Sequence, residues 1–232
     1  MLDELKRQVC EAHLRIVREG LVLLSWGNVS AVDRDGDVLV IKPSGMAYQA
    51  MTAEAMVTVS LSTGKALEGA RRPSSDTPTH LELYRAFPGI KAIVHTHSLY
   101  ATAWAQAGRD IPVLGTTHAD CFDGSVPVTR SMRENEIRDD YERNTGKVIV
   151  ERFRKIDPMR VPAVLVRGHG PFTWGGSLEE AVENAIVLER VAQMASAGLA
   201  LNSSVRPIGK ALREKHFSRK HGPSAYYGQK RK

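Results

Sequence analysis

An Asp-Gly pair at positions 35 and 36 separates two short runs of aliphatic residues, 29–32 and 38–41. Asp-Gly between such runs is a strong signal for a tight β-hairpin. An amphipathic helix precedes the hairpin, because apolar residues recur at helical spacing over residues 3–19 and Gly20 ends the run. The apolar face of that helix needs a sheet to cover, so the chain must combine hairpins with packed helices.

The remaining sequence alternates in the same way. A second hairpin is predicted at 56–61 and 65–68, and further strands at 91–94, 148–153 and 161–166. Helices are predicted at 77–87, 101–107, 134–143, 177–197 and 208–219. Ser177 and Glu180 have capping-box spacing at the start of the long helix, and Gly198 is the expected stop. Residues 1–232 are therefore expected to form a single α+β domain, a three-layer α/β/α sandwich with a central, mostly antiparallel sheet.

Composition limits where such a chain functions. Its 232 residues are 42% hydrophobic, which is ordinary for a soluble domain with a sizeable core. The first residues carry charges of both signs and lead into no apolar stretch, which argues against a secretory signal. The apolar segment 181–201 contains Glu183, Glu189 and Arg190, which favours a core helix over a membrane span. Since the start does not read as a secretory signal, we expect a cytoplasmic protein. Cys10 and Cys121 are too few for a disulfide framework, and both are expected to be reduced thiols.

The positive charge is concentrated at the C-terminal end. Residues 206–232 contain nine Lys or Arg and a single acidic residue, Glu214, so this segment carries +8 and the rest of the chain −2 of the net +6. A basic segment with three aromatic residues can bind nucleic acid, attract an anionic substrate or form a solvated face. No recognisable nucleic-acid motif supports the first alternative.

Two histidines follow an apolar run at 92–94. Side chains two apart on a strand share a face, so His95 and His97 can bind one metal ion. His169, in a second strand-to-turn setting at 164–170, can complete a three-histidine site with room for an acidic ligand or a substrate oxygen. Taken alone, a histidine pair at a strand end can equally form hydrogen bonds with a turn.

Three stretches place small polar side chains beside glycine or a helix start: 25–30 (Ser-Trp-Gly-Asn-Val-Ser), 42–45 (Lys-Pro-Ser-Gly) and 72–78 (Arg-Pro-Ser-Ser-Asp-Thr-Pro). Glycine lets backbone N–H groups approach an anion, serine hydroxyls donate to its oxygens, and a helix N-terminus favours negative charge. Together the stretches can form a phosphate cradle. Each can also be an ordinary turn, and Asp76 can simply cap its helix.

The motifs occur in one order, followed by Gly-His-Gly-Pro-Phe at 168–172 and Ala-Tyr-Tyr-Gly-Gln at 225–229. The sequence resembles the class II aldolase and sugar-phosphate epimerase family over essentially its whole length. Within that family it is similar to the epimerases that interconvert L-ribulose 5-phosphate and D-xylulose 5-phosphate. The resemblance implies inversion at C4 by retro-aldol cleavage and re-addition.

The same resemblance implies roles for individual residues. A divalent metal, usually Zn²⁺ with Mn²⁺ or Co²⁺ as substitutes, is expected on His95, His97 and His169, with Asp76 as a ligand or acid/base partner. Two acid/base groups are expected, Asp120 and Tyr227, with His216 near the same site. Tyr227 is expected to reach a neighbouring subunit of a cyclic homotetramer, carried by the basic segment 206–232. The substrate-binding cradle is expected at Gly27, Asn28, Lys42, Ser44, Gly45, Ser74 and Ser75.

Three other functions compete with the epimerase. An aldolase of the same family would cleave a deoxy-ketose 1-phosphate to dihydroxyacetone phosphate and an aldehyde, but such aldolases tend to carry glutamate where this chain has Asp76. An adducin-like binding domain would have lost the metal ligands, whereas all three histidines are present. A nucleic-acid-binding module is favoured only by the charge of the C-terminal segment. The extra residues Lys230-Arg231-Lys232 depart from the epimerase pattern.

Overall fold

The computed structural model describes residues 2–67, 71–221 and 225–227. Its centre is a six-stranded sheet in which every neighbouring pair is antiparallel. The strands are β1 (Asn28–Asp33), β2 (Val38–Ile41), β3 (Val57–Ser60), β4 (Ala92–His95), β5 (Ala163–Leu165) and β6 (Pro171–Gly175). Their spatial order is β3-β2-β1-β4-β6-β5. The predicted antiparallel sheet is confirmed.

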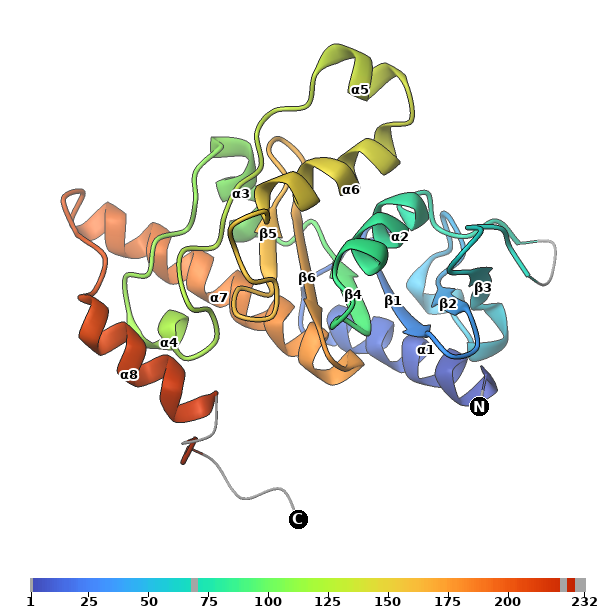
Figure 1. Ribbon diagram of the computed structural model, residues 1–232, viewed down its shortest axis with the longest axis horizontal. Coiled ribbons are helices and arrows are strands. Elements are labelled where there is room, and N and C mark those ends of the chain that lie inside the picture. Colours follow the sequence, from blue (N-terminus) through green and yellow to red (C-terminus); the bar gives the residue numbers. More distant parts are fainter. Residues whose placement is uncertain (1, 68–70, 222–224, 228–232) are drawn as a thin grey trace.

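Helices cover both faces of the sheet (Figure 1). They are α1 (Leu2–Arg18), α2 (Thr77–Ala86), α3 (Leu99–Ala107), α4 (Thr116–Ala119), α5 (Glu134–Arg138), α6 (Tyr141–Arg152), α7 (Leu178–Leu201) and α8 (Lys210–Lys220), with short 3₁₀ turns at Tyr48–Ala50 and Ala53–Ala55. Residues of α2 and α6 pack with Leu39, Ile93 and Trp174 on one face. Residues of α1 and α7 pack with Val40 and Val94 on the other. The three-layer α+β architecture is therefore as predicted.

The hairpin signal at residues 35 and 36 was correct. Asp33 pairs with Val38, and the Asp33 carboxylate accepts a hydrogen bond from the backbone N–H of Gly36 at 3.2 Å. On its other side β1 pairs with β4, so that Asn28 lies opposite His95. The β1–β4 pairing thus brings residues 25–30 to the end of β4, beside the histidine pair.

The strand predicted at 148–153 is wrong. These residues belong to α6 and its C-terminal end, and the helix predicted at 134–143 is divided between α5 and α6. The β-branched residues of this run favour a strand when taken alone. In the fold, Val148, Ile149 and Phe153 are buried at helical spacing, and packing against α2 overrides that local preference.

Two boundaries and one further strand differ from the sequence predictions. The second hairpin is reduced to β3 and an isolated bridge between Val59 and Ala66, and its predicted end at residue 68 lies outside the described residues. Gly198 does not stop the long helix, which continues to Leu201, because one glycine costs a helix only about 1 kcal/mol. The strand β6 was not predicted, since Pro171 and Gly175 at its ends are typical of turns.

Candidate metal centre

The three candidate metal-binding histidines converge on one point. His95 is the last residue of β4, His97 follows two positions later, and His169 lies in the turn between β5 and β6. The Nε2 atoms of His95 and His97 are 3.2 Å apart, and one ring nitrogen from each histidine lies within 4.8 Å of the others. Two nitrogens that bind one ion tetrahedrally at about 2.05 Å are separated by about 3.3 Å. The His95–His97 pair therefore has the spacing of two ligands on one ion, and His169 lies close enough to complete a three-histidine group.

Two glycines allow this convergence. Gly27 has a φ of +74°, and a Cβ there would lie 2.7 Å from the carbonyl oxygen of His95. A Cβ on Gly170 would lie 2.8 Å from the carbonyl oxygen of Thr96. Both segments pass the end of β4 at a distance that only glycine permits. A side chain at either position would force the segments apart and open the histidine cluster.

The His95 ring is held in the tautomer that can bind a metal through Nε2. Nδ1 of His95 donates to the carbonyl oxygen of Pro171 at 2.9 Å, which leaves the lone pair on Nε2. The same ring stacks on Phe172, with centroids 4.1 Å apart. Burial is the main cause of the lowered pKa values of His95, His97 and His169. Neutral imidazoles are metal ligands, so this donor set fits a divalent cation such as Zn²⁺.

Asp76 lies in the same cavity but is not part of the three-histidine cluster. Its carboxylate accepts a hydrogen bond from Nδ2 of Asn28 at 2.6 Å, and the same nitrogen donates to Ser74 Oγ at 3.1 Å. Asp76 occupies the N-cap position of α2, yet its side chain makes no capping hydrogen bond. The simple interpretation of Asp76 as a helix cap is therefore wrong, and its role as ligand or acid/base partner stays a prediction.

A cavity of about 350 Å³ joins the histidines to the predicted phosphate cradle. All seven predicted substrate-binding residues line it: Gly27, Asn28, Lys42, Ser44, Gly45, Ser74 and Ser75. Lys42 donates to the carbonyl oxygen of Ser25 at 2.6 Å, and its Nζ lies 4.8 Å from the ring centroid of Tyr48. Burial lowers the pKa of Lys42 to about 8, against the opposing effect of Asp76. The cavity therefore offers an anion a largely protonated lysine at neutral pH. We call the cavity, the histidines and the cradle the metal half-site.

The predicted acid/base residues form a second cluster around Arg219. Asp120 directly follows α4, and its carboxylate accepts hydrogen bonds from Nδ1 of His216 at 3.0 Å and from Arg219 at 2.9 and 2.6 Å. The Arg219 guanidinium lies 4.7 Å from the ring centroid of Tyr227. Burial raises the pKa of Asp120, but hydrogen bonds from Arg219 and His216 outweigh it and bring the pKa below its usual value. Asp120 is therefore a carboxylate at neutral pH. We call this group the acid/base half-site.

The two half-sites do not meet within one chain. Among the described residues, neither Asp120, His216 nor Tyr227 lines the cavity that holds the histidines. Helices α4 and α8 lie together at one end of the molecule, away from α2, β1 and β2 (Figure 1). The structure thus assembles the two predicted sets of residues separately.

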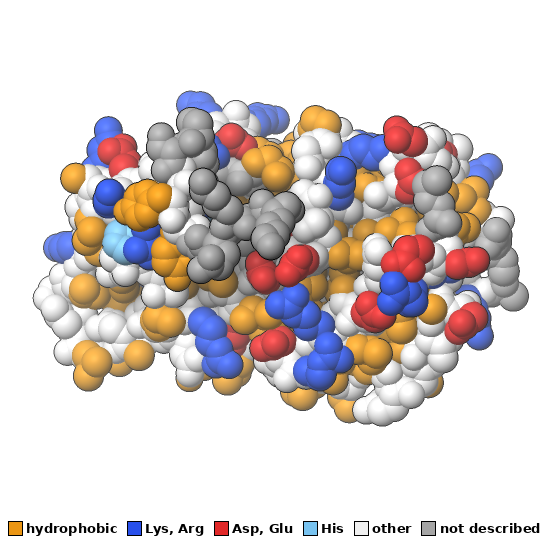
Figure 2. Space-filling model, turned by 90° about the horizontal axis from the view of Figure 1, so that it is seen from below, with side chains coloured by type: hydrophobic (Ala, Val, Ile, Leu, Met, Phe, Trp, Pro, Cys, Tyr) orange, Lys and Arg blue, Asp and Glu red, His pale blue; other side chains and the backbone are white. Residues whose placement is uncertain are grey.

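The basic C-terminal segment is partly neutralised by contacts within the chain. Arg219 and Lys220 approach Asp120, and Arg213 lies 3.7 Å from Asp123. On the face shown in Figure 2, Lys and Arg side chains are interspersed with Asp and Glu. Among the described residues on that face, acidic side chains therefore interrupt the basic ones that a nucleic acid would contact.

Comparison with known proteins identifies the family. The sequence model of one protein family, the class II aldolase and adducin N-terminal domain, matches residues 7–196. The chain belongs to this family. An L-fuculose 1-phosphate aldolase superposes with a TM-score of 0.79 at 23% identity, covering 93% of this chain and 95% of the other. A second one, from Glaciozyma antarctica, superposes with a TM-score of 0.77 at 20% identity, covering 96% of this chain and 84% of its own.

YgbL from Klebsiella pneumoniae shares the same class II aldolase fold, with a TM-score of 0.73 and 27% identity over 93% of this chain and 98% of YgbL. Its description names aldolase, epimerase and decarboxylase as candidate activities. The predicted family and fold are therefore confirmed. No helix in the described part of this class II aldolase domain is both long and apolar enough to cross a membrane.

Sequence reasoning missed two aromatic residues of the cavity. Trp26, which is 48% exposed, has its ring centroid 6.2 Å from that of His97. Tyr141 lies at the start of α6 with its hydroxyl 3.5 Å from Nδ1 of His169. Trp26 could have been found, since it precedes Gly27 in a recognised motif. Tyr141 could not, because only the packing of α6 against α2 brings it to the metal half-site.

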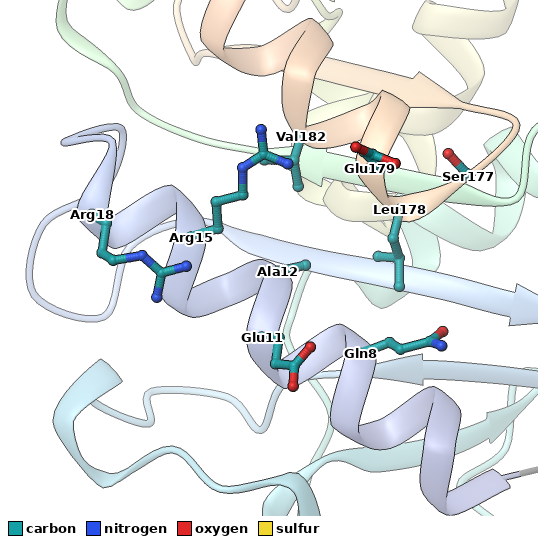
Figure 3. Close-up of a pocket in the computed structure, with 9 residues that line it drawn as sticks. All are labelled: Gln8, Glu11, Ala12, Arg15, Arg18, Ser177, Leu178, Glu179 and Val182. Atoms are coloured by element: carbon teal, nitrogen blue, oxygen red, sulfur yellow. The ribbon is translucent and has the colours of Figure 1, made fainter. Parts of the chain in front are cut away.

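A separate hollow of about 440 Å³ lies between α1 and the start of α7 in this class II aldolase domain (Figure 3). Its lining mixes basic residues, such as Arg15 and Arg18, with acidic ones, such as Glu11 and Glu179. Opposite charges therefore offset each other across this hollow, and the three candidate metal-binding histidines line the smaller cavity instead.

Proposed function

We propose that this member of the class II aldolase family is a metal-dependent 4-epimerase that interconverts L-ribulose 5-phosphate and D-xylulose 5-phosphate. The observation that carries the proposal is the gathering of Asp120, His216 and Tyr227 around Arg219. Inversion by bond cleavage and re-addition needs a proton-transfer group on each face of the aldehyde. The epimerase resemblance assigns these two roles to Asp120 and Tyr227.

The cradle supplies binding. In the proposed complex the substrate phosphate occupies the space beside Ser44, Gly45 and Ser75, where backbone N–H groups and hydroxyls donate to its oxygens. Lys42 adds a positive charge that is nearly closed to water, with only 2% of the residue exposed. The N-terminus of α2 points its partial positive charge at the same region.

His95, His97 and His169 would hold the divalent cation, which we propose to be Zn²⁺ with Mn²⁺ or Co²⁺ as substitutes. When bound, the cation supplies a Lewis acid for the ketose oxygens and for the negative charge that develops when the C3–C4 bond breaks. Asn28 fixes the carboxylate of Asp76 in the cavity, where it serves as a further ligand or as an acid/base partner.

Proton transfer falls to the acid/base half-site. One of Asp120 and Tyr227 accepts the proton of the C4 hydroxyl as the C3–C4 bond breaks to give glycolaldehyde phosphate. The cradle retains the phosphate while the aldehyde turns to present its other face. The C3–C4 bond then forms again, and the second group donates a proton to the new C4 hydroxyl. An aldolase releases its aldehyde after cleavage, whereas the epimerase must retain it for the second bond formation.

The separation of the half-sites supports a shared active site. In the proposed cyclic homotetramer, the acid/base half-site of one chain faces the metal half-site of its neighbour, carried there by the basic C-terminal segment. A cytoplasmic location belongs to the same proposal, since cytoplasmic conditions keep thiols such as Cys10 and Cys121 reduced.

The proposal is tested by incubating metal-loaded protein with L-ribulose 5-phosphate and measuring D-xylulose 5-phosphate and free glycolaldehyde phosphate together. We expect xylulose phosphate to form with little free aldehyde, and a chelator to abolish turnover. A His97→Asn variant should be as inactive as the chelated protein. Formation of xylulose phosphate at an unchanged rate after complete metal removal would contradict the mechanism.

A class II aldolase that cleaves a deoxy-ketose 1-phosphate is the second candidate. The observation that favours it is the structural similarity to two L-fuculose 1-phosphate aldolases. The same assay with L-fuculose 1-phosphate distinguishes the two functions, because an aldolase releases dihydroxyacetone phosphate. Release of that product, with no conversion of L-ribulose 5-phosphate, would replace the epimerase proposal with the aldolase.

A further inference from the structure

The second ring nitrogen of His169 faces a side chain, whereas that of His95 faces the backbone. Nδ1 of His169 lies 3.5 Å from Oη of Tyr141, and Nδ1 of His95 donates to the Pro171 carbonyl at 2.9 Å. Imidazoles that bind a metal generally donate their other N–H to an oxygen, which fixes the tautomer and the ring orientation. Tyr141 therefore presents an oxygen to Nδ1 of His169, as the Pro171 carbonyl does to Nδ1 of His95.

The packing of α6 against α2 fixes the backbone of Tyr141. Thr79 Oγ1 on α2 donates to the carbonyl oxygen of Glu142 at 2.5 Å. A Cβ on Gly146 would lie 2.6 Å from Cβ of Glu82, so the two helices are in direct contact. Since residues 74–76, which lead directly into α2, form part of the cavity wall, the hydroxyl of Tyr141 is held at a set place relative to the histidines.

Tyr141 is also partly exposed to the cavity, which it lines together with His169. A protonated tyrosine hydroxyl can accept one hydrogen bond while it donates another. Its oxygen can thus accept the Nδ1–H of His169, which leaves the lone pair of that ring on Nε2. Nε2 is also the nitrogen through which His95 and His97 approach each other.

We propose that Tyr141 is a positioning residue of the metal centre. Its Oη accepts the Nδ1–H of His169 and holds Nε2 of that ring towards the Nε2 atoms of His95 and His97. The inference rests on the metal-binding part of the proposed function and is independent of which carbon–carbon bond the enzyme breaks. It assigns a role in metal binding to a residue that lies outside the motifs of the sequence.

The Tyr141→Phe variant tests this role because it removes Oη and keeps the ring. We expect its affinity for Zn²⁺ to fall about 10-fold to 100-fold, the usual loss when an outer partner of a histidine ligand is removed. Competition with a fluorescent zinc chelator measures the affinity, and the visible spectrum of the Co²⁺-loaded protein should shift. Tyr100→Phe is the matched control, because Tyr100 packs in the cluster between α3 and α7. It should leave the Zn²⁺ affinity within about twofold.

A double-mutant cycle separates positioning from a general loosening of α6. In the His169→Asn background, Tyr141→Phe should not change the Zn²⁺ affinity further. Equal losses in both backgrounds would overturn the proposal. If the wild-type chain binds no Zn²⁺, the metal part of the proposed function fails as well. If the wild type binds Zn²⁺ and Tyr141→Phe binds it equally well, only the role of Tyr141 fails.

Discussion

Lys42 illustrates how one residue of the cradle combines charge with burial. Its side chain is covered by Tyr48 and tied to the Ser25 carbonyl, and burial lowers its pKa to about 8. A cation so little hydrated binds an anion more strongly than an exposed lysine does. The same burial makes that charge sensitive to mild alkali.

Anion binding should therefore weaken as the pH rises through about 8. Above that pH, deprotonation of Lys42 should reduce the affinity for inorganic phosphate about tenfold per pH unit. Isothermal titration calorimetry between about pH 7.5 and 9.5 measures this affinity. Ordinary lysines stay largely protonated over that range, because the pKa of a free lysine lies near 10.4. Lys42→Arg is the control, because guanidinium stays protonated and its binding should stay level. The same decline in both proteins would remove Lys42 as the cause.

At the residue scale, the three polar stretches, and the family resemblance that their order and spacing carry, named seven cradle residues, and all seven line one cavity. The same spacing could not place Tyr141. Its neighbours in the sequence are acidic and polar, and its position depends on helix packing between distant segments.

Glu189 links two helices at the scale of secondary structure. It interrupts the apolar sequence of α7 and is almost fully buried, and its carboxylate accepts hydrogen bonds from the backbone N–H groups of Tyr100 and Ala101, both at 2.9 Å. These N–H groups lie at the start of α3, where Ser98 makes no side-chain capping bond. Glu189 therefore caps α3, the helix that directly follows the histidine pair.

The Glu189→Gln variant should lower the free energy of unfolding by about 1–3 kcal/mol, because an amide cannot accept from both N–H groups as a carboxylate does. Glu183→Gln is the matched control on the same helix, where the Glu183 side chain is 56% exposed. It should change stability by less than about 0.5 kcal/mol. Urea unfolding measures both, and equal effects would show that Glu189 does not cap α3.

Element prediction succeeded where the signal is local and failed where it is not. The hairpin at Asp33–Val38 and the Ser177 cap of α7 depend on neighbouring residues, so they were found. Residues 148–153 look like a strand because Val and Ile dominate them, but their partner is α2, more than fifty positions away in the sequence. The capping of α3 by Glu189 has no local signal either.

At the scale of the whole molecule, the two half-sites lie on one chain without meeting. The metal half-site gathers at the end of β4, and the acid/base half-site is held between α4 and α8. Sequence resemblance predicted both sets of residues. The resemblance also implied that Tyr227 reaches a neighbouring subunit. Residue spacing alone could not show the separation, because it depends on where the last helix packs.

Mixing two inactive variants tests whether neighbouring chains share a site. Asp120→Asn and His97→Asn should each abolish epimerisation, because each destroys one half-site. Dissociated and reassembled together in equal amounts, they should recover about a quarter of the wild-type activity, since random pairing joins two intact halves at that frequency. Asp120→Asn mixed with Tyr227→Phe should recover none, because both lie in the same half-site. Failure of the first mixture would exclude a shared site.

A shared active site also determines how a defect in one chain affects the activity of neighbouring chains in the assembly. In the proposed ring, a chain that fails to fold its C-terminal helix leaves its own metal half-site intact and silences that of its neighbour. A chain that is defective in both halves silences two sites. A minor population of chains defective in both halves would then inhibit sound ones, and the loss of activity would exceed the fraction of faulty protein.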